Sequence, residues 1–136
     1  MIVDTSAMIA ALLHEEGHEA ILDAIEDEQS LVPAPALGEF WTVVSGARLN
    51  AVDQASALLA EWQDGGLTVL PFNEVHAMRV REAIPLYGRG NGSGGLLNLL
   101  DLMVYAVAKE SGEPLLCTGK DFAATDIALH GASRPW

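Results

Sequence analysis

Short apolar runs alternate with longer helical segments along this sequence, and that alternation constrains the fold more than any other feature. The short runs, which are typical of buried strands, are Ile2-Val3, Leu31-Val32, Leu67–Leu70 and Leu115-Leu116-Cys117. Between them, apolar residues recur with helical spacing over 5–13, 17–28, 51–63, 73–87 and 98–111, and a further helix opens at Pro33 and Pro35 and runs to about Arg48. This order predicts an α/β fold in which helices cover both faces of a parallel sheet. The run at 115–117 is the clearest candidate for a central strand.

Cap and breaker residues predict where several of these helices begin and end. Thr5 or Ser6 is available as the N-cap of the first helix, and Asn73 precedes the helix over 73–87. Gly112 ends the helix over 98–111, and a short turn after the last strand leads to Asp126-Ile127. Residues 88–95 contain five glycines in eight positions, which predicts a flexible loop between two helices.

Length and composition predict one globular domain over residues 1–136. Half of the residues are hydrophobic, which excludes a disordered chain, yet no uncharged apolar run approaches the roughly 18 residues that cross a bilayer. Met1 leads directly into Ile2-Val3 without a basic segment, so we expect no secretory signal. Cys117 is the single cysteine, which excludes an internal disulfide. We therefore expect a cytoplasmic protein without a membrane partner.

The chain carries a formal net charge of −12, from 19 acidic against 7 basic side chains. A nonspecific nucleic-acid binder needs a basic surface, so the global charge argues against that class. Seven of the acids lie between residues 15 and 28, where they predict one solvated helix face. The basic residues come later, at Arg48, Arg79, Arg81, Arg89, Lys109 and Lys120. The net charge therefore does not determine the electrostatic potential around any one site.

Two acids follow predicted strands, and two more lie in apolar surroundings at predicted helix starts. Asp4 ends the first strand, and Asp121 comes four residues after Cys117. Both therefore fall at the carboxyl edge of the sheet, where α/β proteins bind ligands. Glu39 and Asp101 lie in the first turns of their helices among apolar neighbours. Burial of such an acid is costly unless it is paired or binds a metal.

Each acid also has a purely structural interpretation. Asp4 suits an N-cap, and Asp101 suits the first turn of a helix, where an acid complements the helix dipole. Glu39 alone reads as an exposed helix residue, and Asp121 alone as a turn former. Their convergence on one edge of one sheet favours a joint functional role over four independent structural ones.

Other chemistries are tested by spacing. Thr118-Gly119-Lys120 resembles the end of a phosphate-binding loop, but the first glycine of that motif falls at Pro114. A phosphatase that uses an aspartate after its first strand needs a second aspartate where this chain has Ser6. His14 and His18 share the spacing of a helical zinc pair, but no third ligand is evident.

The pattern as a whole resembles the PIN-domain ribonucleases and, within them, the VapC toxins of type II toxin–antitoxin pairs. The resemblance covers essentially the whole chain. It is carried by Met1-Ile2-Val3-Asp4-Thr5-Ser6-Ala7, Pro35-Ala36-Leu37-Gly38-Glu39, Leu97-Asn98-Leu99-Leu100-Asp101 with Tyr105-Ala106, and Glu113-Pro114-Leu115-Leu116 through Thr118-Gly119-Lys120-Asp121-Phe122 to Thr125-Asp126-Ile127.

The resemblance implies a three-layer α/β/α domain with a mostly parallel central sheet and an acidic pocket that holds Mg²⁺ or Mn²⁺. Carried over by position, the catalytic and metal-binding acids are Asp4, Glu39, Asp101 and Asp121. Ser6 and Thr118 are expected as supporting hydroxyls, and Asp126 as an additional outer acid. The implied function is a metal-dependent endoribonuclease toxin that cleaves RNA.

The resemblance also implies partners. A cognate VapB-type antitoxin is expected to neutralise the toxin by covering the pocket, and a homodimer or toxin–antitoxin hetero-oligomer is expected. An apolar groove between residues 5–28 and 34–63 is a candidate seat for an amphipathic helix, with Trp41 and Trp62 either anchoring it or filling the core.

One departure from the family keeps an alternative open. Relatives commonly carry Phe-Gly or a similar pair before the third acid, whereas this chain has Leu99-Leu100. A bulky residue there predicts a narrowed pocket or a displaced Asp101. The alternative function is a catalytically weak PIN-fold domain that binds RNA or a partner protein without cleavage.

Overall fold

Four short strands form a single parallel sheet at the centre of the molecule. The computed structural model describes all residues from 1 to 136. The strands are β1 (Ile2–Val3), β2 (Leu31–Pro33), β3 (Thr68–Leu70) and β4 (Leu115–Leu116). Their order in the sheet is β3-β2-β1-β4, and each neighbouring pair is parallel. All four carboxyl ends therefore lie at one edge, as the alternating pattern predicts.

The prediction of a central strand over residues 115–117 is wrong, because β4 is the last strand of the sheet. Its residues are nevertheless fully buried, since the C-terminal segment covers the outer edge. There the Leu115 amide donates to the Ala128 carbonyl, and the Arg134 amide donates to the Cys117 carbonyl, both at 2.9 Å. A covered edge strand carries the same continuous apolar run as a central strand, so the two are indistinguishable in sequence.

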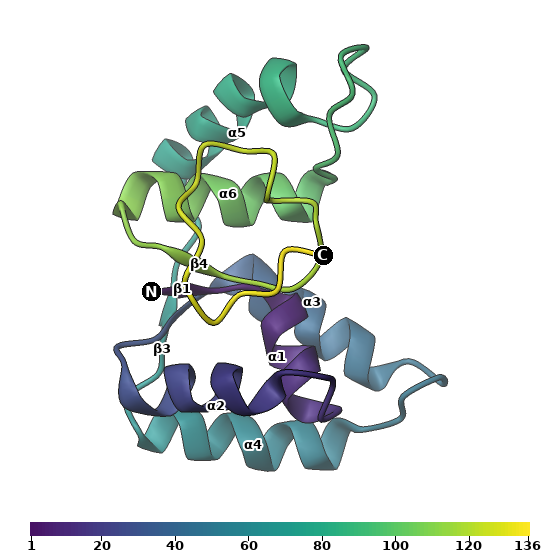
Figure 1. Cartoon of the computed structure of the whole chain (residues 1–136), viewed down its shortest axis with the longest axis vertical. Coiled ribbons are helices and arrows are strands. Elements are labelled where there is room, and N and C mark those ends of the chain that lie inside the picture. Colours follow the sequence, from purple (N-terminus) through teal and green to yellow (C-terminus); the bar gives the residue numbers. More distant parts are fainter.

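Six helices complete three layers (Figure 1). The helices α1 (Thr5–Leu12), α2 (His18–Asp27), α3 (Ala34–Ser45) and α4 (Val52–Asp64) lie on one side of the sheet, and α5 (Glu74–Tyr87) and α6 (Leu99–Ser111) lie on the other. The predicted α/β/α architecture is thus confirmed. The third helix is shorter than predicted because Gly46 turns into an extended conformation after Ser45. None of the six is both long and apolar enough to reach across a bilayer.

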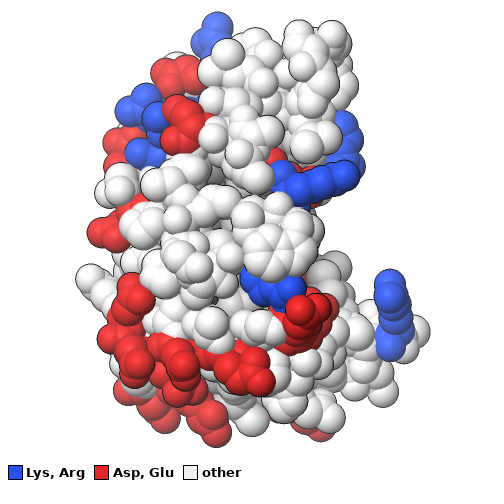
Figure 2. Space-filling view, viewed as in Figure 1, with Lys and Arg blue, Asp and Glu red and all other residues white.

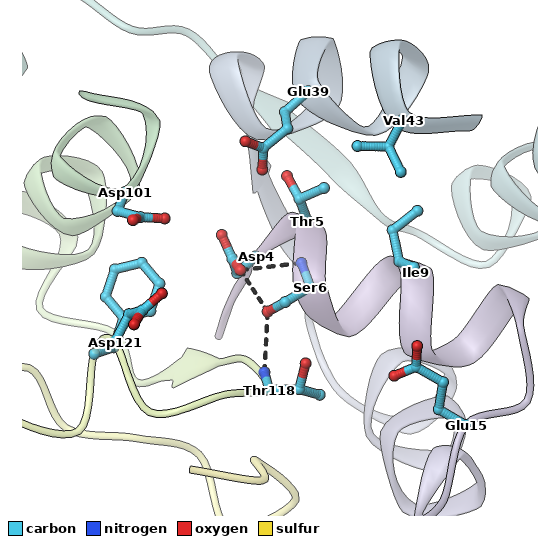
Figure 3. Close-up of a pocket in the computed structure, with 11 residues that line it drawn as sticks. Asp4, Thr5, Ser6, Ile9, Glu15, Glu39, Val43, Asp101, Thr118 and Asp121 are labelled. Atoms are coloured by element: carbon cyan, nitrogen blue, oxygen red, sulfur yellow. Dashed lines mark hydrogen bonds between the residues drawn. The ribbon is translucent and has the colours of Figure 1, made fainter. Parts of the chain in front are cut away.

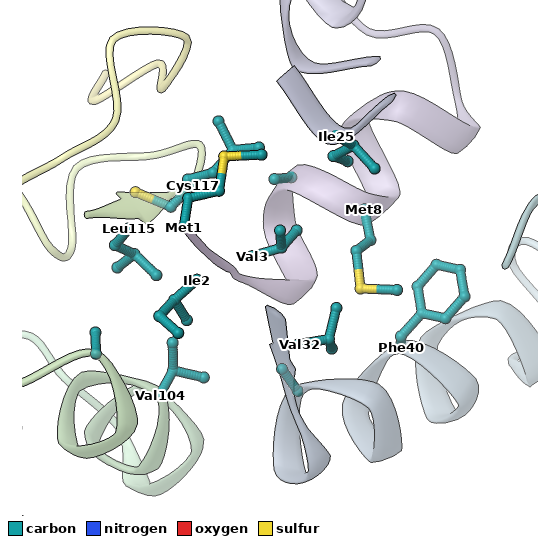
Figure 4. Packing of buried hydrophobic residues seen from close by; sticks show 14 of the residues in the cluster. Met1, Ile2, Val3, Met8, Ile25, Val32, Phe40, Val104, Leu115 and Cys117 are labelled. Carbon is teal, nitrogen blue, oxygen red and sulfur yellow. The ribbon is translucent and has the colours of Figure 1, made fainter. Parts of the chain in front are cut away.

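The strand β1 contributes one buried side chain to the hydrophobic layer on each face of the sheet. Ile2 and Val3 are fully buried, and successive strand side chains point to opposite faces. Figure 4 shows Ile2 directed toward Val104 of α6, while Val3 faces Met8 of α1. This double burial explains why the first strand has no polar residue before Asp4.

Side-chain caps fix the starts of three helices. The Asp4 carboxylate caps α1 by accepting from the Ser6 amide, which confirms the structural interpretation given to Asp4, whereas Thr5 and Ser6 do not cap this helix. Asn73 caps α5 as predicted, and Asn98 forms a reciprocal capping box with Asp101 at the start of α6. The caps therefore place two of the candidate acids, Asp4 and Asp101, at helix N-termini beside the sheet edge.

Candidate active site

A cavity of about 420 Å³ opens at the carboxyl edge of the sheet and contains all four candidate acids (Figure 3). Asp4 follows β1, Glu39 lies on α3, Asp101 lies in the first turn of α6, and Asp121 follows β4. We call this cavity the acidic pocket; its remaining lining residues are Thr5, Ser6, Ile9, Glu15, Val43, Thr118 and Phe122. Acids almost 120 positions apart in sequence thus share one cavity because parallel strands end at the same edge.

Asp4 is the most deeply placed of the four acids. It is only 6% exposed, and its Oδ2 accepts hydrogen bonds from the Ser6 amide at 3.0 Å and the Ser6 hydroxyl at 2.5 Å. The pKa of Asp4 is raised to about 6, chiefly by burial and to a smaller extent by the negative charges of Asp101 and Glu39, while the Ser6 hydrogen bonds act to lower it. The pocket therefore disfavours the ionised carboxylate unless positive charge is supplied.

Ser6 connects the two strands that end at the pocket. While its hydroxyl donates to Asp4, the same oxygen accepts from the Thr118 amide at 3.0 Å. Thr118 lines the pocket as predicted, but its contact with Ser6 is made by the backbone and not by the hydroxyl. Ser6 thus orients Asp4 and ties the chain after β4 to the start of α1.

Asp101 has a structural contact and a free oxygen at the same time. Its Oδ2 accepts from the Asn98 amide at 3.0 Å, whereas Oδ1 has no hydrogen-bond partner in the chain. The pKa of Asp101 is raised, first by burial and then by the charges of Asp121 and Glu39, while the Arg89 charge opposes them. The capping role expected from sequence and a place in the pocket are therefore compatible.

Glu39 and Asp121 are half-buried, and no group of the chain donates a hydrogen bond to either carboxylate. No lysine, arginine or histidine forms an ion pair with any of the four acids, since the ion pairs of the chain all lie elsewhere. None of the four acids is thus neutralised by a direct ion pair, and Arg89 acts on Asp101 only through its charge at longer range.

The donor chemistry of the pocket fits a hard, hydrated cation. Its charged ligands are oxygens only, the set that Mg²⁺ and Mn²⁺ prefer, and Mg²⁺ keeps several waters while taking one or two carboxylates. Nowhere in the chain do three or more histidine, cysteine, aspartate or glutamate side chains come close enough to hold one ion directly. His14 and His18, for their part, stack with ring centroids 4.8 Å apart. The acidic pocket therefore suits an ion held partly through water.

Asp126 is not brought to the acidic pocket. Its Oδ1 accepts from the Tyr105 hydroxyl at 2.7 Å, and its Oδ2 pairs with the Lys109 ammonium at 2.6 Å. The hydrogen bond from Lys109 is the main reason that the pKa of Asp126 is lowered. These contacts tie the turn after Asp121 to the middle of α6, which is a structural role in place of the predicted outer acid.

Sequence reasoning missed one acid of the pocket and overstated the effect of two leucines. Glu15 lines the pocket, although the acidic stretch around it predicts a solvated face, and no local pattern distinguishes it from its neighbours. Leu99 is 65% exposed, and neither it nor Leu100 lines the pocket, so the leucine pair does not narrow it.

Comparison of the sequence with known proteins identifies the family to which this fold and its acidic pocket belong. Residues 1–128 match the family model described as PIN domain. Ribonuclease VapC42 of Mycobacterium tuberculosis is 35% identical over 128 residues, which cover 93% of this chain and 96% of the relative. Ribonuclease VapC28 of the same species is 37% identical over 93% of this chain and 95% of its own. The chain therefore belongs to the PIN-domain family, in the branch of the VapC ribonucleases.

Solved structures agree on the fold. Mycobacterium tuberculosis VapC20, described as a sarcin–ricin loop cleaving toxin, superposes with a TM-score of 0.70 at 20% identity and covers 93% of this chain and 95% of its own. VapBC2 from Rickettsia felis, solved with a DNA fragment from its promoter, gives a TM-score of 0.71 at 14% identity over 95% and 96% of the two chains. At such identities the likeness concerns the arrangement of helices and strands.

Proposed function

We propose that this chain is a divalent-metal-dependent endoribonuclease and the toxin of a toxin–antitoxin pair. The observation that carries the proposal is the acidic pocket itself, in which Asp4, Glu39, Asp101 and Asp121 from four separate elements share one cavity without a direct ion pair to any of them. Membership in the VapC ribonucleases supports RNA as the substrate class. A phosphodiester is the expected substrate group, because a divalent cation held by the carboxylates would also attract phosphate oxygens.

In this proposal, Asp4, Glu39, Asp101 and Asp121 would together hold Mg²⁺ or Mn²⁺. When bound, the ion supplies the positive charge that activates a water for attack on phosphorus and stabilises the leaving oxygen. The chain's own part is to orient the carboxylates. Ser6 fixes one oxygen of Asp4, Asn98 fixes one oxygen of Asp101, and the second oxygen of each stays unbonded within the chain.

Four basic side chains outside any ion pair are candidates for contact with the RNA backbone. They are Arg48, Arg81, Arg89 and Lys120. Basic groups flank the hollowed side of the molecule in Figure 2, whereas acids crowd the lower left. Arg79, by contrast, is occupied by ion pairs with Glu82 and Glu110. The uneven charge distribution reconciles a net charge of −12 with a nucleic-acid substrate.

For the antitoxin, the proposed seat is a groove that is continuous with the acidic pocket. The groove is lined by Ile9, Leu13, Glu15, Val43, Arg48 and Leu49, and it shares Ile9, Glu15 and Val43 with the pocket. Trp62 is buried and Trp41 packs against the core, so neither tryptophan anchors the groove. An amphipathic helix seated there ends at the carboxylates, where a basic side chain of the partner blocks the site.

The deciding experiment is RNA cleavage by the wild-type chain and by Asp101→Asn, each titrated with Mg²⁺ and Mn²⁺. Cleavage that requires metal and falls at least about hundredfold in Asp101→Asn supports the enzyme. Asp23→Asn is the matched control, because Asp23 is an exposed acid on α2 outside the pocket. Metal-independent cleavage, or equal behaviour of wild type and Asp101→Asn, contradicts the proposal and leaves the non-cleaving PIN-fold domain.

A further inference from the structure

A second cavity, of about 170 Å³, adjoins the acidic pocket. The two cavities share Asp121, so they meet at one of the four carboxylates. One wall is formed by the end of α5 and the glycine-rich loop, and the other by the turn after Asp121. The lining residues are Leu86, Tyr87, Ser93, Gly94, Gly95, Leu96, Leu97, Asp121, Ala124 and Thr125. We call this space the side cavity.

The glycine loop, residues 88–95, is closed at its neck by backbone hydrogen bonds that the sequence-based prediction of a flexible loop does not include. The Leu97 amide donates to the Tyr87 carbonyl at 3.0 Å, and the Arg89 amide donates to the Leu97 carbonyl at 2.8 Å. A Cβ at Gly95 would lie 2.2 Å from the Gly88 carbonyl oxygen, so the two backbones touch at the neck. The wall of the side cavity is therefore preformed.

Asn91 organises the interior of the loop. Its Oδ1 accepts from the amides of Ser93 and Gly95, and its Nδ2 donates to the Pro85 carbonyl at the end of α5. These bonds leave the Ser93 hydroxyl and the Gly94 amide without partners in the chain, and Ser93 and Gly94 are lining residues of the side cavity. The cavity thus offers hydrogen-bonding groups on a rigid frame.

The chemistry of the side cavity matches a flat, neutral group with polar edges. Apart from Asp121 at the shared boundary, its lining carries no charge, and Leu86, Leu97 and the half-buried Tyr87 ring give it apolar walls. A phosphate would be repelled by Asp121 and would find no cation inside. A nucleobase pairs an apolar face with donors and acceptors on its edges, which is the form in which proteins read unpaired RNA.

Arg89 is a basic residue next to both cavities, although it lines neither. Arg89 begins the glycine loop, is exposed, and approaches the Leu96 carbonyl with Nη2 at 3.4 Å. Its charge also reaches Asp101 in the acidic pocket. Arg89 is therefore close to both cavities and suited to a backbone phosphate that joins a base in one to a phosphodiester in the other.

From this juxtaposition we propose that the side cavity receives one unpaired nucleobase of the RNA, next to the phosphate at the acidic pocket, and thereby selects the cleavage position. The inference rests on the proposed ribonuclease activity and adds a site that reads sequence or local unpairing. Because the base must leave its stack to enter, the cavity favours single-stranded loops over duplex RNA.

The test fills the side cavity from a residue that touches no carboxylate. Ala124→Trp places a large side chain on the cavity wall, and Ala123→Trp is the matched control, since Ala123 is an exposed neighbour outside both linings. The substrate is a single-stranded RNA with one cleavage site, prepared also as a set in which each nucleotide near that site is made abasic in turn.

With wild type and Ala123→Trp, we expect one abasic position beside the cleavage site to slow cleavage at least about fivefold, the lower end of what base stacking supplies. Ala124→Trp is expected to cleave the intact RNA more slowly and to show no further loss at that position. An abasic penalty that is the same in all three proteins, or absent from wild type, overturns the inference. A wild-type chain that cleaves no RNA with either metal instead refutes the proposed function, so the two failures are distinguishable.

Discussion

The hydroxyl of Ser6 donates to the carboxylate of Asp4 and is the single polar side-chain contact that orients this buried acid. Because the same oxygen accepts from the Thr118 amide, one side chain couples the ends of β1 and β4. The pocket thus combines a local contact between Asp4 and Ser6 with a contact between Ser6 and Thr118, which are 112 residues apart in sequence.

Removal of that hydroxyl tests the coupling. We expect Ser6→Ala to lower RNA cleavage about tenfold to hundredfold, because a misplaced carboxylate is a misplaced metal ligand. The free energy of unfolding is expected to fall by about 1 kcal/mol, since the Thr118 amide loses its acceptor. Urea unfolding and cleavage rates measure the two effects. Ser6→Thr keeps the oxygen and is expected to retain activity, so an equal loss in both variants contradicts the role of the hydroxyl.

The raised pKa of Asp4 predicts that the stability of the metal-free chain falls as pH rises through about 6. That pKa is about 6 in the folded chain, against 3.8 for an ordinary aspartate, so the unfolded chain releases this proton first as pH rises. The stability contributed by Asp4 is present below pH 3.8 and is lost as pH rises through about 6.

In EDTA, therefore, Asp4→Asn is expected to gain about 2–3 kcal/mol relative to wild type between pH 4 and pH 7. Denaturant unfolding of the two proteins across this range gives the difference directly, and subtraction removes the titration of all other groups. Parallel stability curves would show that burial does not strain Asp4. The same variant is expected to be inactive with either metal.

Binding of Mg²⁺ should stabilise the folded chain by relieving the repulsion among the four acids. At a Mg²⁺ concentration of about 100 times the dissociation constant, the gain is about 2.7 kcal/mol, visible as a rise in melting temperature. Sodium chloride at the same ionic strength is the essential control, because screening alone also weakens repulsion. Asp101→Asn should lose most of the Mg²⁺-specific rise and Asp23→Asn should keep it; equal shifts with both salts would argue against a metal site.

The ion pair between Lys109 and Asp126 allows a test of whether Asp126 is structural or catalytic. Asp126 has a lowered pKa, so this pair stabilises the fold above pH 3.8 and loses its effect as pH falls further. Asp126 is 47% exposed, and we expect Lys109→Met to cost less than about 1 kcal/mol, without a change in cleavage rate per folded molecule. Thermal melts and cleavage assays on the same samples measure both. A strong loss of cleavage at unchanged stability would return Asp126 to the catalytic machinery.

Asn91 should govern the order of the glycine loop independently of global stability. Asn91→Ala removes the acceptor for the Ser93 and Gly95 amides. We expect the hydrogen exchange of these two amides to rise at least about tenfold while core amides such as Leu115 stay protected. Native-state hydrogen exchange reports each amide separately; uniform loss of protection across the chain would mean that Asn91 supports the whole fold instead.

The sequence by itself determined the fold class and the identity of the four candidate acids. Strand and helix periods are local, since apolar spacing and cap residues such as Asn73 act within a few positions, and parallel strands must end at one edge. Hence Asp4 and Asp121 could be placed together without coordinates. Glu39 and Asp101 could be added because burying an acid among apolar residues is costly unless it is paired or binds a metal.

Tertiary structure alone decided what lies beside those acids. The C-terminal segment covers β4, which is why this edge strand has the sequence of a central one. Asp126 pairs with Lys109 and does not line the pocket. The glycine loop is closed by contacts between backbone segments. Each outcome depends on pairings between residues distant in sequence, whose energies leave no local pattern. For the same reason the side cavity, which joins the end of α5 to the turn after Asp121, becomes visible only when the chain is folded.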